Sequence, residues 1–324
     1  MSTGPGESVP AGHRNDAAAH AQDPTLTLLG VAAHGLAGSR IRPPSGPLDP
    51  AAWRALVRAC SEEHLVGLLA ATVDGGELQV SGAQVADLAA RVADVRARSA
   101  AVRESVVATS RRLDADGTDH HVLDGPVVAQ RAYADPSVRD FEEVHILVDD
   151  SSPPIPPLQD AAVLFRRDLL PAELGQPVGL GDAKRQATRV EVDGHPVPAL
   201  PAEAQLVYTC AQAASASVTG GLLALRDVAQ LALTDDVDPV GVARFVGSGR
   251  ATAVVARAVR LAWQGFDLAD KTRLSVWASR YDAEVVAGRI PGPRADGTRA
   301  GTRVGAVAQR ITAALAAPVR KAAR

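Results

Sequence analysis

The sequence of 324 residues is poor in the residues that provide cross-links and distinctive chemistry. Aromatic residues make up 3% of it, and it has one methionine and two cysteines. Two cysteines are too few for a zinc site built from cysteine alone. Because Cys60 and Cys210 both lie in apolar segments that look helical, we expect buried free thiols rather than a disulfide. The core must therefore be built mainly from alanine, valine and leucine.

The chain also lacks a long apolar run and a strong charge of either sign. No run approaches the roughly 18 residues that span a bilayer. The N-terminus has no basic stretch followed by an apolar one, which a secretory signal would require. The net charge of -3 is too close to zero to indicate a nucleic-acid or membrane partner. We expect a cytoplasmic protein that does not bind nucleic acid, and membrane association is disfavoured.

Composition and apolar periodicity divide the chain into five parts. They are a disordered tail (1–24), an N-terminal helical region (25–115), an α/β core (116–200), a C-terminal helical region (201–290) and a linker with a basic amphipathic helix (291–324). Strands between two runs of helices indicate an α+β fold, with a small mixed sheet embedded between helical segments. The last helix could pack on the domain, dock on a partner or lie on an anionic membrane surface.

Caps and spacing predict the N-terminal helices. Asp49-Pro50 is typical of a helix start and precedes an apolar stripe. A short helix is predicted over residues 65–73 and a long one over residues 81–113. The apolar stripe of the long helix is predicted to contain Val85, Leu88, Ala89, Val92 and Val95.

The apolar period changes to that of strands after residue 116. Strands are predicted over residues 120–123, 144–148 and 161–165, followed by a hairpin of residues 189–192 and 195–200. Asp193-Gly194 forms the tight turn of this hairpin. The proline-rich residues 151–157 must form a loop. One or two helical turns are predicted over residues 127–133, and further helices over residues 203–216, 222–233, 239–246, 252–264 and 271–286.

Three short segments around the first two strands form a pattern. They are Leu123-Asp124-Gly125, Tyr133-Ala134-Asp135-Pro136-Ser137-Val138-Arg139 and Glu143-Val144-His145-Ile146-Leu147-Val148. With Trp53 and the downstream Leu225-Arg226-Asp227, they resemble an uncharacterised minimal nucleotidyltransferase family of bacteria, over about residues 48–289. That family belongs to the polymerase-β-like superfamily and is often encoded beside peptide or sugar biosynthesis genes.

The resemblance implies a site at these segments. In the family, the second strand carries Asp-x-Asp and the turn is Leu-Lys-Gly. Aspartates at i and i+2 on a strand share a face, so both can bridge the two Mg²⁺ ions of nucleotidyl transfer. The lysine neutralises phosphate charge. The implied catalytic positions are Asp124, Glu143 and His145, with Glu143 and His145 as ligands of Mg²⁺ or another divalent cation, and Gly125 and Arg139 as substrate-binding residues.

The charged family positions are replaced in this chain. Glu143 keeps the charge, but His145 supplies an imidazole that suits zinc or copper better than magnesium. Asp124 reverses the charge where a triphosphate would lie. The third carboxylate, expected on the next strand, is absent from residues 162–165. Each lost electrostatic contact of this kind lowers a rate by about 10²–10³.

Two functions follow from these observations, and the sequence leaves both open. The first is a catalytically impaired nucleotidyltransferase-fold protein that acts as a binding or accessory protein in a bacterial biosynthetic pathway. Its partner would be a biosynthetic enzyme or a small-molecule or nucleotide ligand. The second is an active metal-dependent nucleotidyltransferase that transfers a nucleotide from an NTP to a small molecule or peptide.

Structural roles are the simpler interpretation of several polar residues. His145 is then a hydrogen-bonded strand histidine and Glu143 a solvated edge residue. Arg226 and Asp227 would form an internal salt bridge on their helix. His120-His121 would be the polar start of a strand rather than a pair of metal ligands.

Overall fold

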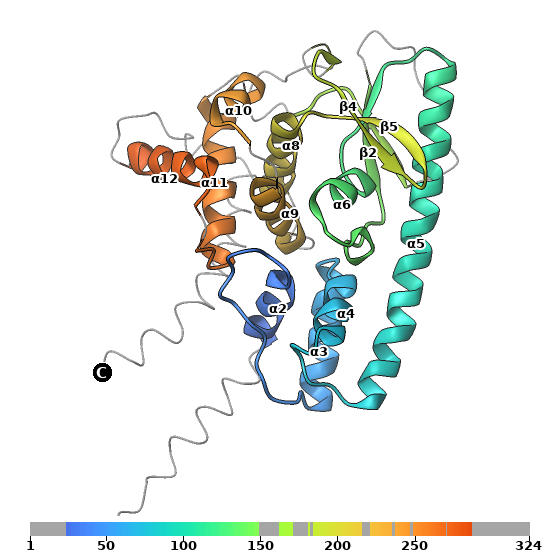
Figure 1. The fold of residues 1–324 in the computed structure, drawn as a ribbon, viewed down its shortest axis with the longest axis vertical. Helices are drawn as coiled ribbons and strands as arrows, with labels where there is room; N and C mark the ends of the chain where they lie inside the picture. The colour runs from blue at the N-terminus through green and yellow to red at the C-terminus, as the bar shows by residue number, and fades with distance from the viewer. Residues whose placement is uncertain are drawn as a thin grey trace, which may run out of the picture.

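The structure is a computed structural model that describes residues 24–148, 162–170, 181, 184–215, 221–234, 237–246, 249–269 and 271–286. The predicted tail (1–24, apart from Pro24) and the predicted basic helix (291–324) lie outside these residues. The sheet lies at one end of the molecule, with the N-terminal helices at the other end and the C-terminal helices beside both (Figure 1).

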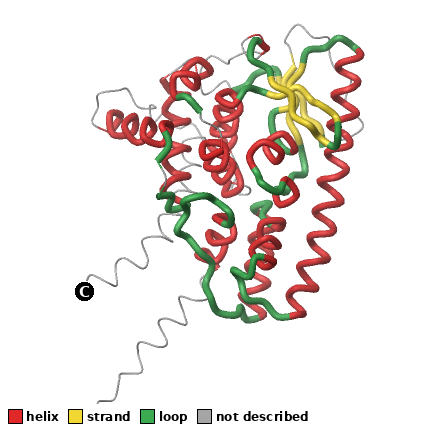
Figure 2. Tube along the Cα trace, in the orientation of Figure 1, coloured by secondary structure: helices red, strands yellow, loops and turns green. Residues whose placement is uncertain are grey.

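Helices precede and follow the sheet (Figure 2). Before it are α2 (Pro24–Ala33), α3 (Pro50–Glu62), α4 (Val66–Asp74) and α5 (Gly82–Ala115). Between the first two strands are α6 (Pro126–Ala132) and the 3₁₀ helix η1 (Pro136–Val138). After it are α8 (Ala202–Ser215), α9 (Gly221–Thr234), α10 (Pro239–Val246), α11 (Gly249–Gly265) and α12 (Arg273–Val286). The sequence predicts all of these except α2 and η1, within a few residues at each end.

The long helix α5 begins with a capping box. Gln84 N–H donates to the Ser81 hydroxyl, and the Ser81 N–H donates to Gln84 Oε1 at 2.7 Å. The predicted stripe is right at Leu88, which is buried, but Val85 is 46% exposed and Ala89 is exposed as well. In this first turn Gln84 faces inward instead, and its amide donates to Leu48 O at 3.1 Å.

The sheet is mixed, with strand order β3-β2-β1-β5-β4. Its strands are β1 (His120–Val122), β2 (Val144–Val148), β3 (Val163–Arg166), β4 (Thr188–Val192) and β5 (His195–Ala199). The pairs β1–β2 and β4–β5 are antiparallel, whereas β1–β5 and β2–β3 are parallel. The expectation of an α+β fold with a mixed sheet flanked by helices is confirmed.

The β4–β5 hairpin has the predicted two-residue turn. Asp193 and Gly194 have φ angles of 47° and 75°, as a type I′ turn requires at both central positions. Arg103 of α5 donates to both oxygens of the Asp193 carboxylate, at 3.0 and 2.9 Å. This contact connects the hairpin to the long helix.

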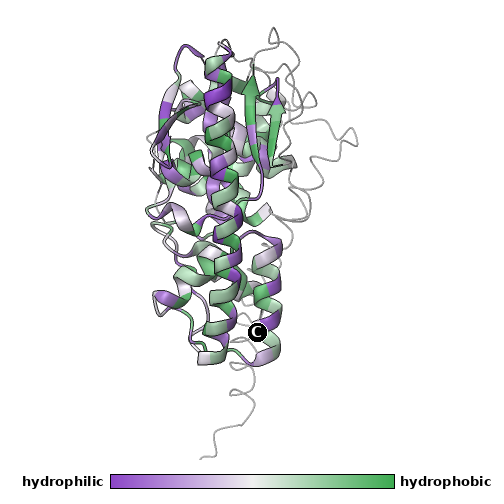
Figure 3. Ribbon diagram, turned by 90° about the vertical axis from the view of Figure 1, so that its right-hand side faces the viewer, coloured by the Kyte–Doolittle hydropathy of each residue, from purple (hydrophilic) through white to green (hydrophobic). Residues whose placement is uncertain are grey.

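The two faces of the sheet pack against different helices. One face, with Val122, Ile146 and Val197, forms a hydrophobic cluster with Val102 and Val106 of α5. Figure 3 shows α5 running past the strands along the length of the molecule. On the other face Leu123, Leu147 and Leu200 join a larger cluster that also contains residues of α8 and α9. Side chains on that second face are those that surround the predicted site.

Both cysteines lie in the interior of the protein. Cys60 and Cys210 are both free and buried, as predicted. Burial raises the pKa of both thiols far above the usual range, so both cysteines stay protonated and serve as small apolar side chains.

In the part of the chain that the structure describes, no helix is both long and apolar enough to cross a membrane.

Candidate functional site

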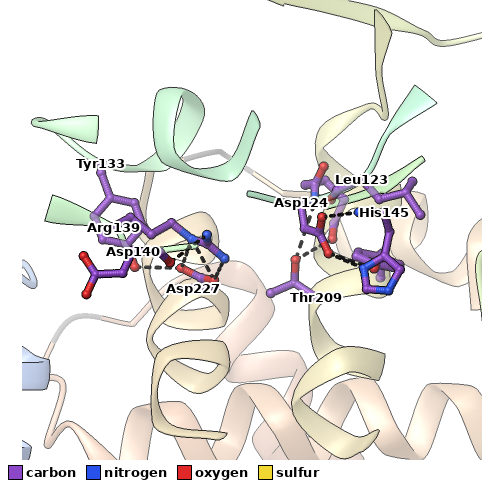
Figure 4. Close-up of polar contacts among 10 residues, drawn as sticks. Leu123, Asp124, Tyr133, Arg139, Asp140, His145, Thr209 and Asp227 are labelled. Carbon is purple, nitrogen blue, oxygen red and sulfur yellow. Dashed lines mark hydrogen bonds and ion pairs between the residues drawn. The ribbon is translucent and has the colours of Figure 1, made fainter. Parts of the chain in front are cut away.

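Asp124 and His145 lie in direct contact where β1 ends beside β2 (Figure 4). His145 Nδ1 lies 2.7 Å from Asp124 Oδ2, and the backbone N–H of His145 donates to Asp124 Oδ1 at 2.8 Å. The Tyr208 hydroxyl, from α8, donates to Asp124 Oδ2 at 3.0 Å. Both carboxylate oxygens are therefore occupied by groups of the protein itself. His145 is the hydrogen-bonded strand histidine that the sequence predicts.

The turn after β1 holds Asp124 in this position. Leu123 N–H donates to His145 O at 2.9 Å, which extends the β1–β2 pairing to the residue before Asp124. Gly125 follows with φ 56° and ψ -116°, a conformation open essentially to glycine alone. A Cβ atom there would lie 2.5 Å from Val144 Cγ2. The turn therefore requires glycine for its backbone conformation and for its close contact with β2.

Glu143 lies beside this network but outside it. It is exposed and precedes β2 directly, two residues before His145 and so on the same face of the strand. The pKa of Tyr208 is raised well above its usual value, first by burial and then by the charge of Asp124, with a smaller effect of Glu143. Tyr208 thus remains a protonated donor to Asp124.

Part of the chain is similar to a known protein family. Residues 49–154 match the model of a family described as an uncharacterised nucleotidyltransferase. The match supports a nucleotidyltransferase-type region over these residues. The matched region ends before β3, so it is shorter than the span of about residues 48–289 expected from the sequence. No curated protein and no solved structure matches the chain.

The side chains of Asp124, Glu143 and His145 do not fit the pair of Mg²⁺ ions that the family resemblance implies. Among the described residues, no three His, Cys, Asp or Glu side chains lie close enough together to hold a metal ion. Asp124 already accepts hydrogen bonds at both oxygens. The remaining carboxylate, Glu143, would then share a metal ion only with the imidazole of His145. Imidazole is a poor ligand of magnesium. Asp149, which the sequence places just after β2 and which could also supply a carboxylate, lies outside the described residues.

Arg139, the predicted substrate-binding arginine of the nucleotidyltransferase region, forms a separate buried cluster (Figure 4). Its Nη2 lies 2.7 Å from Asp227 Oδ2 of α9, and the two side chains are 9% and 4% exposed. The Tyr133 hydroxyl donates to Asp227 Oδ1 at 2.6 Å. The guanidinium charge is therefore neutralised inside the protein, and substrate binding by Arg139 stays a prediction.

The expected salt bridge between Arg226 and Asp227 is wrong. Asp227 pairs with Arg139, whereas Arg226 donates to the carbonyl oxygen of Ala32 and lies over the Tyr133 ring, 5.1 Å from its centroid. Consecutive residues on a helix do not face each other, so this pair could have been rejected from the sequence. The two residues instead connect α9 to α2 and to the segment of residues 133–139.

His120 and His121 are both buried rather than a polar start of the strand. His120 Nε2 lies 2.7 Å from Ser110 Oγ, and its Nδ1 lies 3.0 Å from Thr118 O. Neither ring nitrogen of His121 has a hydrogen-bond partner among the described residues. Burial, followed by the effect of His120, lowers the pKa of His121 to about 4. His121 is therefore a neutral core residue at physiological pH.

Asp140 is a buried polar residue that sequence reasoning did not single out. Its Oδ2 accepts the backbone N–H of Val66 at 2.7 Å, and both oxygens accept the N–H of Gly67 at 3.1 and 3.2 Å. These are orphan donors at the start of α4, so a residue distant in sequence caps this helix. Burial raises the pKa of Asp140 to about 6 although these hydrogen bonds act in the opposite direction.

Proposed function

We propose that the protein is a catalytically impaired nucleotidyltransferase-fold protein that acts as a binding or accessory protein in a biosynthetic pathway. The observation that supports this most is the closed network of Asp124, His145 and Tyr208. Nucleotidyl transfer needs free carboxylates for metal ions and a cation for the triphosphate. The partner class, a biosynthetic enzyme or a small-molecule or nucleotide ligand, follows from the family resemblance.

The energetics of the network favour this proposal. A hydrogen bond to a charged group contributes about 1.5–3 kcal/mol, and Asp124 accepts three that a metal ion would have to displace in part. A triphosphate at this position would also meet the negative charges of Asp124 and Glu143 without the family lysine. Binding of Mg-NTP is therefore opposed by lost hydrogen bonds and by charge repulsion.

Calorimetric titration of the full chain with Mg-ATP tests the proposal. We expect no measurable binding. A variant carrying Asp124→Lys, Glu143→Asp and His145→Asp restores the family pattern and serves as the matched comparison, with folding checked by circular dichroism. Magnesium-dependent binding of ATP to the unmodified chain in the micromolar range would contradict the proposal.

An active metal-dependent nucleotidyltransferase is the second candidate, and one observation favours it. Because a carboxylate can only accept, Asp124 fixes the proton of His145 on Nδ1 and leaves Nε2 as a base or metal ligand. Glu143 lies on the same strand face. If the protein is this enzyme, incubating it with labelled nucleotides and Mg²⁺, Mn²⁺ or Zn²⁺ should transfer the label to a small-molecule or peptide acceptor. Loss of the label in both Glu143→Ala and His145→Ala would support this enzyme.

A further inference from the structure

A pocket lies away from the Asp124–His145 network, between the N-terminal helices and α5. Its volume is about 210 Å³, and it is lined by residues from the end of α3, the start of α4, the middle of α5 and the segment of residues 140–142. In Figure 1, α3 and α4 run beside the lower half of α5. Pockets for drug-sized ligands are usually larger, so this one suits a small metabolite.

The α5 side of this pocket carries charges of alternating sign. Arg91, Asp94 and Arg98 all line it. They follow one another at intervals of three and four residues, so they lie on one face of the helix. Arg91 and Arg98 form ion pairs whose members are 41–55% exposed. Exposed ion pairs contribute little stability, so both guanidinium groups can exchange these partners for a ligand at small cost.

Strained backbone lies at the opposite side of the pocket. His64, between α3 and α4, has φ 55°, and it lines the cavity. Its N–H donates to Ser61 O, and the N–H of Leu65 donates to Cys60 O at 2.7 Å. This is the helix-ending motif in which glycine normally occupies the left-handed position. A side chain kept there against backbone preference indicates a role for the imidazole.

We propose that this pocket binds a small zwitterion of the α-amino acid class. The ammonium group would lie against Asp94, and the carboxylate would lie against Arg98 and His64. A simple anion fits less well because Asp94, Asp140 and Glu142 also line the cavity, and a simple cation fits less well because two arginines do. Val95 and Phe141 supply apolar wall for a side chain. The inference does not depend on whether nucleotidyl transfer is lost.

Ligand-observed NMR of the full chain with each of the free proteinogenic amino acids tests the site. We expect at least one to bind, and its decarboxylated amine and deaminated acid to bind about tenfold or more weakly. Asp94→Asn and Arg98→Gln should each weaken binding by a similar factor. Both side chains are exposed, so these variants keep the fold. Arg96→Gln, exposed on α5 outside the pocket, should bind as the unmodified chain does.

His64→Gly separates a ligand role from a purely structural one. Relief of the backbone strain should raise the melting temperature, and loss of the imidazole should weaken binding. A stabilised variant with unchanged affinity would overturn the role of His64. Absence of binding by any amino acid at millimolar concentration would overturn the site, as would equal binding of the deaminated acid.

Discussion

Arg139 and Asp227 are separated by 88 residues in the chain and form a buried ion pair, with Nη2 2.7 Å from Oδ2. Asp227 lies on α9, outside the matched family region, whereas Arg139 lies inside it. The pair, together with the Tyr133 hydroxyl, therefore connects the nucleotidyltransferase region to the C-terminal helices. One member of the ion pair therefore lies on each side of the interface between these two parts.

Removal of one member of this pair should strongly destabilise the protein. Arg139→Met leaves the Asp227 carboxylate buried without its partner, and we expect the free energy of unfolding to fall by about 3–5 kcal/mol in urea denaturation. The double variant Arg139→Met/Asp227→Leu removes both charges and should recover most of that loss. Equal stability of the single and double variants would show that the loss does not come from the unpaired charge of Asp227.

Gly125→Ala should destabilise the turn after β1. The positive φ at Gly125 costs about 1–3 kcal/mol for another residue, and the new Cβ would overlap Val144 Cγ2 in addition. Gly82→Ala, at the first residue of α5 with open space around it, is the control and should be neutral or slightly stabilising. Thermal unfolding of both variants measures the difference. Similar melting temperatures would contradict the steric argument.

Asp140 should give the stability of the protein an unusual dependence on pH. Its pKa in the folded protein, about 6, exceeds its ordinary value of 3.8, so the folded state holds the proton more tightly than the unfolded state. The contribution of Asp140 is therefore fully present below about pH 4 and falls as the pH rises toward 6. The total change is on the order of 3 kcal/mol.

Comparison with Asp140→Asn isolates this contribution, because asparagine does not titrate. The unfolding free energy of the unmodified chain minus that of the variant should decrease between pH 4 and 6. A constant difference across this range would refute the assignment.

The contribution of His121 to stability should depend on pH in the opposite direction from that of Asp140. Its pKa of about 4 lies below the ordinary value of 6.5, so the unfolded state binds the proton more readily and stability rises with pH between these values. His121→Leu removes two buried ring nitrogens without partners, and we expect a gain of about 1–3 kcal/mol together with loss of this slope. Denaturant unfolding at pH 5 and pH 7 measures both effects. A less stable variant would indicate that the ring nitrogens are used.

Local sequence signals predicted most of the fold because they act over a few residues. The Asp193-Gly194 turn and the Asp49-Pro50 start of α3 each depend on neighbouring positions, and both are found. The helix α2 was missed because it follows directly on a segment interpreted as a disordered tail. Val85 was misplaced because the inward residue of that turn is Gln84, and its partner Leu48 lies 36 residues away.

The candidate site was predicted only in part. The positions Asp124, Glu143 and His145 were identified from the family pattern, and the structure brings Asp124 and His145 together. The carboxylate of Asp124 also accepts a hydrogen bond from Tyr208, a residue 84 positions away that no local motif marks. The same holds for Asp140, whose helix-capping role depends on a backbone 73 or 74 residues distant. Such long-range polar contacts require the tertiary arrangement.

The helix α5 contributes to two hydrophobic clusters among the described residues. Leu88 belongs to the larger cluster with the N-terminal helices, whereas Val102, Val106 and Leu113 belong to the cluster beneath the sheet. Because the same continuous helix packs into both clusters, loss of packing in one removes support from the other. We therefore expect the described parts of the chain to unfold in one cooperative transition, with amide protons of both clusters exchanging through the same global opening.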